Sequence, residues 1–416
     1  MVFLKFRYIK NAVAVSLAVT ALLIMSSCSF LEELDSLISA SQTETQDTTE
    51  PLKKRHPVET SYGFENLSDD SLEDLYYLID EYSDNKSGVE FKIDGIYTYR
   101  QIHETIIAYK NDHPENFWLK TSYSYYNLDS ETYIYLFFNK SKDEIDEAKE
   151  KFNAVVDEIV SNAPKNASDF EIEKYINDYL IDNCEYDHEA AENEKIIANE
   201  NDAYGALVDK KAVCEGYARA FQLLCTRLGL DCVNITGESE GVGHQWNCVK
   251  IEGDWYYVDV TWNDTDGEAE YLKYDYFNLT TEQLKKTHKI DIAFAELTDD
   301  EYNESYSYNL FIPQCTSDEY NYYKYTCLTI DDIYNSDEIK NSIAKSVKNG
   351  ETYYNFRINE ELDYSSVTDE LITQGYMYEW LVGVNDINGY DPEINPSCKV
   401  YENSEHNVVT IVLEYI

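Results

Sequence analysis

The chain of 416 residues has 80 acidic but only 33 basic side chains, which gives a formal net charge of −47 at pH 7. A charge of this sign and size favours solubility and argues against binding of nucleic acid or an anionic surface by attraction. The chain is also too long for one simple hydrophobic core, so we predict two or three folded units.

The first 27 residues have the pattern of a secretory signal peptide. Three basic residues within the first ten positions precede an apolar run at 12–25, and two serines separate this run from Cys28. The run is too short to span a membrane. The small pair followed by cysteine resembles a bacterial lipoprotein box, although Met25 stands where leucine is usual. We therefore predict Cys28 as the lipid-attachment residue, with ordinary signal cleavage nearby as the alternative.

Residues 28–60 are predicted to form a polar tether. The stretch 39–57 consists mainly of Ser, Thr, Gln and Glu and contains almost no apolar residues, so it cannot bury enough surface to fold. Together with the preceding segment, the tether predicts an exported protein anchored by lipid on the extracellular face of the cell membrane.

Residues 61–165 are predicted to form an N-terminal α/β accessory unit. A helix is expected after Ser68, and another over 143–160. The segments 89–99 and 122–139 are rich in Tyr, Phe and Ile, which favours strands. The aromatic segment HPENFWLKTSYSYY could form a binding surface, but strand formation and core packing explain it better.

A helix with a cysteine in its first turn is the central feature of the next unit, residues 166–300. Ser168 and Glu171 form a capping box that opens this unit. Apolar residues at three- and four-residue steps predict a helix over 213–228 that stops at Gly229. Cys214 then lies at the positive end of the helix dipole, which favours the nucleophilic thiolate, and the two lysines just before it act in the same direction.

A predicted hairpin brings a histidine and an aspartate together. If 244–251 and 254–261 pair across a tight turn, residue 251 faces 254 and residue 246 faces 259. His244 and Asp259 are then diagonal neighbours on one side of the ribbon, and four valine and isoleucine residues form a core face on the other. His244 and Asp259 share a face of the ribbon if the loop has two or four residues, but not if it has three. Cysteine, histidine and a carboxylate are the groups of a catalytic triad for acyl transfer.

The blocks AVCEGYARAF, GHQWN and DWYYVDVTW resemble the core of bacterial transglutaminase-like proteins, relatives of the papain-like thiol enzymes. The resemblance places Cys214 on the family's nucleophile, His244 on its base and Asp259 on its third member. It implies an α+β fold with a transglutaminase-like or papain-like core, in which the helix bearing the nucleophile packs on an antiparallel sheet. Two smaller α/β units are expected to flank this core.

Other residues that could carry chemistry are interpreted as structural. Cys225, Cys232 and Cys248 are expected in the core, because a cysteine taken alone is most often a small buried hydrophobe. His188 is expected in a solvated loop, and His288 is isolated in the sequence and is assigned a structural role. Cysteine spacing shows no zinc pattern, so we expect neither a metal nor a cofactor.

Residues 301–416 are predicted to form a C-terminal α/β accessory domain. Strands are expected around 322–330, 351–358 and 408–415, and helices over 331–348 and 360–374. No nucleophile, base or metal spacing occurs there.

The resulting hypothesis is an exported cysteine enzyme that transfers acyl groups of peptide or side-chain amides through a thioester. Its substrate would be a protein or peptide. Transfer to water would make it a peptidase or amidase, which we favour over transfer to an amine, the reaction of a protein crosslinker. The alternative is a catalytically inactive transglutaminase-like fold that serves as a cell-surface binding or scaffold protein.

Overall fold

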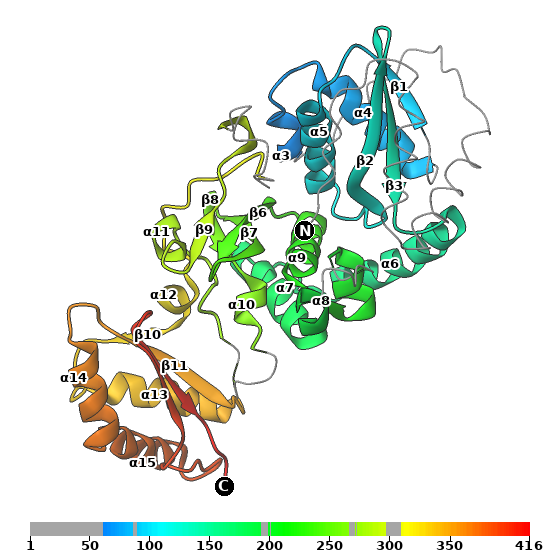
Figure 1. Ribbon diagram of the computed structural model, residues 1–416. Helices are drawn as coiled ribbons and strands as arrows, with labels where there is room; N and C mark the ends of the chain where they lie inside the picture. The colour runs from blue at the N-terminus through cyan, green and yellow to red at the C-terminus, as the bar shows by residue number, and fades with distance from the viewer. Residues whose placement is uncertain are drawn as a thin grey trace. The chain divides into compact units, whose positions relative to one another are not determined.

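The computed structural model describes most of the chain after residue 60, namely residues 61–85, 90–192, 199, 201–265, 271, 273–296 and 309–416 (Figure 1). The predicted signal peptide, the lipid-attachment residue Cys28 and the tether lie outside the described residues. Within the described part, no helix is long and apolar enough to cross a membrane.

The N-terminal part contains an antiparallel sheet in the order β1-β3-β2. Side chains alternate along its strands, and one face forms a core with the neighbouring helices. The elements are α3 (Tyr62–Glu65), α4 (Leu72–Asn85), β1 (Glu90–Asp94), α5 (Tyr99–Asp112), β2 (Leu119–Leu128), β3 (Glu131–Phe138) and α6 (Lys142–Asn162).

Helix α5 was not predicted. The expected strand 89–99 ends at Asp94, and Thr98 then forms a capping box with Gln101 that starts the helix. The apolar residues of the aromatic segment, Phe117, Trp118 and Leu119, are at most 4% exposed, so packing explains that part of it.

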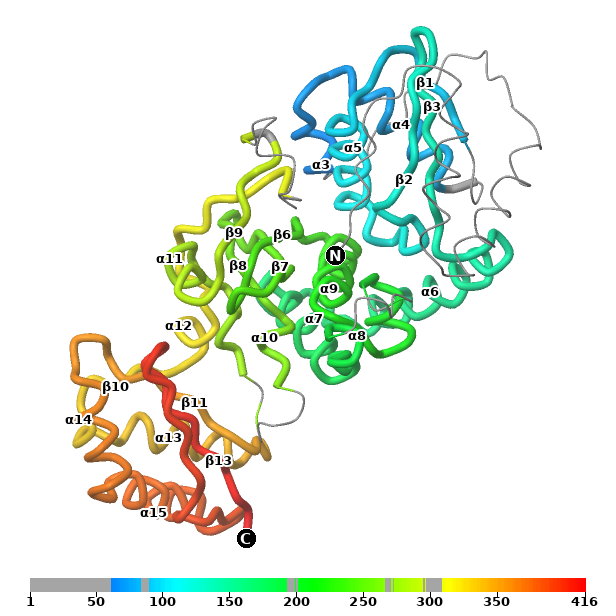
Figure 2. The backbone as a smooth tube through the Cα atoms, in the orientation of Figure 1, coloured from blue at the N-terminus to red at the C-terminus, as the bar shows by residue number. Residues whose placement is uncertain are grey.

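The central sheet has four antiparallel strands in the order β8-β7-β6-β9, which Figure 2 shows side by side. Helix α9 packs against β6 and β7, as the resemblance implied. The strands are β6 (Cys232–Ser239), β7 (Val242–Ile251), β8 (Asp254–Val258) and β9 (His288–Ile290). The helical elements around them are α7 (Asp169–Asn183), α8 (His188–Glu192), η1 (Gly205–Asp209), α9 (Cys214–Leu228), α10 (Val260–Asn263), α11 (Thr281–Leu284) and η2 (Phe294–Glu296); β4 (Glu185–Tyr186) and β5 (Lys211–Ala212) form a short parallel pair.

The predicted register of the β7–β8 hairpin is confirmed. Ile251 pairs with Asp254, and Asn247 pairs with Val258. The turn residues Glu252 and Gly253 both have positive φ, which is typical of a two-residue hairpin turn. The expected core face is buried and belongs to the central core cluster.

The C-terminal part contains a mixed sheet in the order β10-β11-β13-β12 with a core of its own. The prediction of a strand over 322–330 is wrong in its first half, because Asn321 caps a short helix there. Helix α15 and strand β12 were not predicted. The elements are α12 (Tyr322–Thr326), β10 (Leu328–Ile330), α13 (Asp337–Lys348), β11 (Tyr353–Ile358), α14 (Tyr364–Thr368), η4 (Asp369–Thr373), α15 (Tyr376–Asn388), β12 (Val400–Asn403) and β13 (Val408–Val412).

Candidate active site

Cys214 is the first residue of α9, and its thiol is free and half-buried. The preceding residue, Val213, makes no side-chain hydrogen bond to cap the helix. The N–H groups of the first turn are therefore not satisfied by the cap side chain and can face a developing negative charge. The lysines that precede the helix are engaged elsewhere, because Lys211 pairs with Asp187 at 3.2 Å and Lys210 donates to the Tyr179 hydroxyl.

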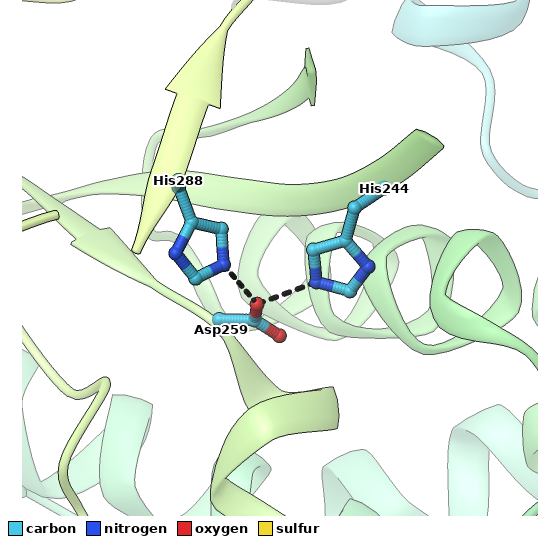
Figure 3. Close-up of side chains that lie close together, drawn as sticks. All are labelled: His244, Asp259 and His288. Atoms are coloured by element: carbon cyan, nitrogen blue, oxygen red, sulfur yellow. Dashed lines mark hydrogen bonds and ion pairs between the residues drawn. The ribbon is translucent and has the colours of Figure 1, made fainter. Parts of the chain in front are cut away.

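His244 and Asp259 form a buried ion pair. Nε2 of His244 donates to Oδ2 of Asp259 at 2.6 Å, and their side chains are 8% and 1% exposed (Figure 3). The expected strand 254–261 ends at Val258, so Asp259 is not a strand residue. It caps α10 instead, and its Oδ1 accepts from the backbone N–H of Trp262 at 3.1 Å. The short polar side chain of aspartate favours such a cap over a strand.

The electrostatics of the pair favour an imidazolium and a carboxylate. Burial lowers the pKa of His244, but the charge and hydrogen bond of Asp259 and a hydrogen bond to Cys214 outweigh this and raise it to about 10. Burial raises the pKa of Asp259, but His244 and His288 hold it well below its ordinary value. Since Nε2 of His244 faces Asp259, Nδ1 is the nitrogen left for Cys214.

His288 contacts Asp259, so its interpretation as an isolated residue is wrong. Its Nε2 atom lies 3.0 Å from Oδ2 of Asp259, and its side chain is fully buried. Figure 3 shows the two imidazole rings on either side of the carboxylate. Strand β9 pairs with β6, where His288 faces Ser239 and His244 of β7 faces Gly237. Both histidines therefore lie on one face of the sheet. The alternation argument would have found His288 if the β6–β9 pairing had been evident from the sequence.

Aromatic rings enclose the two histidines. The ring of His288 lies 5.0 Å from that of Trp246, 5.1 Å from Trp262 and 5.5 Å from Tyr276, measured between centroids. The ring of His244 lies 5.8 Å from Trp246. The side chains of both histidines are at most 8% exposed among these rings, and charge interactions in such a site are stronger than in solvent.

His244, Asp259 and His288 also have the composition of a metal site. Across the part of the chain that the structure describes, they are the one group of three or more His, Cys, Asp or Glu residues whose ligand atoms all lie within 4.8 Å of one another. Two imidazole nitrogens and a carboxylate oxygen are ligands that zinc accepts. The same three atoms are already joined by two hydrogen bonds of 2.6 and 3.0 Å, both of which a metal ion would replace.

The remaining cysteines are mostly core residues. Cys225, Cys232 and Cys248 are at most 5% exposed, which confirms their interpretation as packing residues. All eight cysteines in the described residues are free. Sγ of Cys248 lies 3.1 Å from Sγ of Cys315, and both are buried.

Residues 153–260 match the family model of the transglutaminase-like superfamily. The matched segment contains Cys214, His244 and Asp259, and His288 lies beyond it. The fold of this part is therefore transglutaminase-like, with mixed α and β content.

Two curated relatives are kyphoscoliosis peptidases. That of Mus musculus is 32% identical over 144 residues, which are 30% of this chain and 21% of the relative. That of Homo sapiens is 33% identical over 121 residues, which are 26% of this chain and 18% of the relative. The matched region thus spans about a fifth of these relatives' length. Among solved structures, one described as a TGase is 18% identical to this chain, with a TM-score of 0.26. The aligned region covers 49% of this chain and 60% of the TGase chain.

Proposed function

Because the chain contains a transglutaminase-like domain, we propose that it is an exported cysteine enzyme that transfers acyl groups from peptide or side-chain amides through a thioester. The observation that carries the proposal is the buried His244–Asp259 pair, 2.6 Å apart, with Cys214 hydrogen-bonded to the same imidazole at the start of α9. Nucleophile, base and orienting carboxylate then have the mutual contacts that thiol catalysis requires.

The thiolate forms when Cys214 gives its proton to Nδ1 of His244. It attacks the amide carbonyl, and the backbone N–H groups at the start of α9 stabilise the oxyanion. His244 then protonates the leaving nitrogen, the carbon–nitrogen bond breaks and a thioester remains on Cys214. Next, His244 takes a proton from water and the hydroxide attacks the thioester; the carbon–sulfur bond breaks, the acid product leaves, and the sulfur of Cys214 takes the proton back from His244.

Water is the proposed acceptor, so the activity is that of a peptidase or amidase rather than of a protein crosslinker. Cys214 is half-buried rather than enclosed, so water can reach a thioester on it, and hydrolysis is the simpler outcome. The strongly acidic chain suits neutral or cationic peptide substrates better than acidic ones.

We propose that the protein acts on the outer face of the cell membrane, where a lipid attached to Cys28 anchors it. The basic start, the short apolar run and the small residues before Cys28 support this. Metabolic labelling with an alkyne fatty acid should tag the wild-type chain and leave Cys28→Ser untagged.

The test of the activity is trapping of the acyl-enzyme. The protein is mixed with an activated peptide ester, and the reaction is quenched in acid. The protein is then digested, and its peptides are analysed by mass spectrometry. We expect the acyl group on Cys214 in wild type and none in Cys214→Ala, and an added primary amine should leave most product as the free acid. Predominant amide product would indicate a crosslinker. The absence of any acyl-Cys214 from a folded protein would instead support the scaffold function.

A further inference from the structure

The carboxylate of Asp259 uses both oxygens, and its partners come from three elements. Oδ1 accepts from the N–H of Trp262 in α10, whereas Oδ2 accepts from His244 of β7 at 2.6 Å and from His288 of β9 at 3.0 Å. His288 is therefore in contact with the orienting member of the triad. It is a residue that acts through Asp259.

The tautomer of His288 follows from both of its polar neighbours, because the carboxylate of Asp259 only accepts and must face a protonated Nε2. Oγ1 of Thr287 lies 2.8 Å from Nδ1 of His288 but 3.4 Å from the carbonyl oxygen of Leu284. The hydroxyl therefore donates to Nδ1, the nearer acceptor, and the imidazole proton resides on Nε2. The side chain of Tyr276 is also hydrogen-bonded to Thr287, so a chain of polar groups leads from Tyr276 to Asp259.

The charge state of His288 follows from its surroundings. The titratable groups in contact with it are His244 from β7, Asp259 at the start of α10 and Tyr276. The two imidazole rings are 5.5 Å apart between centroids and share one carboxylate oxygen in a site lined by aromatic rings. Two imidazolium ions there would repel each other, so His288 is neutral when His244 carries the charge.

We propose that neutral His288 is a positioning residue, whose Nε2–H donates to Asp259, fixes the carboxylate toward His244 and takes up part of its negative charge. This proposal rests on the proposed function, because it assigns a role within the same triad. Sharing of the charge has a chemical consequence. Asp259 is then a weaker hydrogen-bond acceptor for the imidazolium of His244, so His244 releases its proton more easily to the leaving nitrogen.

The test is NMR spectroscopy of the full-length protein in detergent with ¹⁵N-labelled histidine. The chain contains seven histidines, and single substitutions assign their signals. In wild type we expect His288 to be protonated on Nε2 alone. In His288→Phe, which removes the donor but keeps a ring, we expect the proton between His244 and Asp259 to move to lower field, because Oδ2 is then a stronger acceptor. His288→Gln restores an N–H donor and should move the signal back.

Two further variants separate positioning from packing. Thr287→Val keeps the shape of the side chain but removes the hydroxyl, so the Nδ1 signal of His288 should shift while the proton stays on Nε2, where Asp259 still accepts it. His188→Gln changes an exposed histidine and should leave the His244 signal unchanged.

The proposal is overturned by a wild-type His288 that is doubly protonated or protonated on Nδ1, or by a His244 signal that is the same in folded His288→Phe. The proposal is also overturned if added Zn²⁺ binds to the wild-type protein in a 1:1 ratio and displaces the imidazole protons of His244 and His288 that face Asp259. The three residues would then form a metal site. None of these signals depends on turnover. Failure of this inference is therefore distinct from failure of the proposed function, which acyl-enzyme trapping tests.

Discussion

Nε2 of His244 lies 2.6 Å from Oδ2 of Asp259, at the point where the hairpin ends and α10 begins. Both side chains are buried, and the carboxylate accepts three hydrogen bonds in all. Removal of the carboxylate thus affects two imidazole rings and a helix cap at once. This makes Asp259 the residue on which the geometry of the site depends.

Asp259→Ala should lower the free energy of unfolding by about 2–5 kcal/mol. It removes a helix cap and leaves two buried imidazole N–H groups without an acceptor. Asp259→Asn should have a smaller effect, because the amide oxygen can still cap α10 and accept one bond. Urea denaturation monitored by circular dichroism measures both. A matched control is Glu282→Ala, which breaks an exposed pair with Lys285. If Asp259→Ala were as stable as this control, the network would have no structural importance.

The stability of the protein should fall as the pH rises from about 7 to 10. Burial disfavours the imidazolium of His244, but Asp259 and the hydrogen bond to Cys214 raise its pKa from 6.5 to about 10. The folded state then binds the proton more tightly than the unfolded state. The resulting stabilisation is complete below about pH 6.5 and is lost as the pH approaches 10. The difference in unfolding free energy between wild type and His244→Gln should shrink across this range. A difference that is constant with pH would show that His244 is not held as an imidazolium.

Gly237→Ala should disturb the placement of His288, which lies on the neighbouring strand. A Cβ atom at Gly237 would lie 2.1 Å from the carbonyl oxygen of Lys289 and 2.7 Å from the ring of Trp246. Strand β9 must move to make room, at an expected loss of about 1–3 kcal/mol of stability. Gly243→Ala is the matched control, because a Cβ there meets nothing within 4 Å. Thermal unfolding of the two variants should differ clearly, and equal melting temperatures would contradict the close packing of β6 and β9.

Cys248 and Cys315 should be joined by a disulfide when the protein is refolded from denaturant in the presence of oxidised glutathione, because both thiols are buried in the folded state and can be reached only before it forms. Their Sγ atoms are 3.1 Å apart, compared with a bond length of about 2.05 Å. The two thiols lose their hydrogens, and one oxidised glutathione becomes two reduced molecules. Peptide mapping without reduction identifies the link. Recovery of both thiols unlinked, with other cysteines joined instead, would be the contrary result.

The sequence predicted those parts of the site that depend on local chain geometry. Helix α9, the capping box at Ser168 and the register of the β7–β8 hairpin each follow from neighbouring residues, and all agree with the structure. The contact of His288 with Asp259 depends on the pairing of a three-residue strand with β6, about fifty positions earlier in the chain. No local pattern specifies that pairing.

The errors at the ends of elements have a related cause. Asp259 and Asn321 were assigned to or beside strands, yet each caps a helix with its side chain. A cap and a turn depend on the same short polar residues, so sequence patterns locate an element better than its last residue. Helix α5 was missed for a different reason, because its capping box, Thr98 and Gln101, could have been recognised in the sequence.

The most direct test of the Cys214–His244 pair, on which the proposed acyl transfer depends, is the rate of iodoacetamide labelling of this thiol as a function of pH, in wild type and in His244→Ala. A thiolate stabilised by the imidazolium should label rapidly down to about pH 6, well below the ordinary thiol pKa of about 8.5, and this reactivity should be lost in the variant. Slow labelling that follows an ordinary thiol titration in both proteins would contradict the account and leave the fold as a binding scaffold.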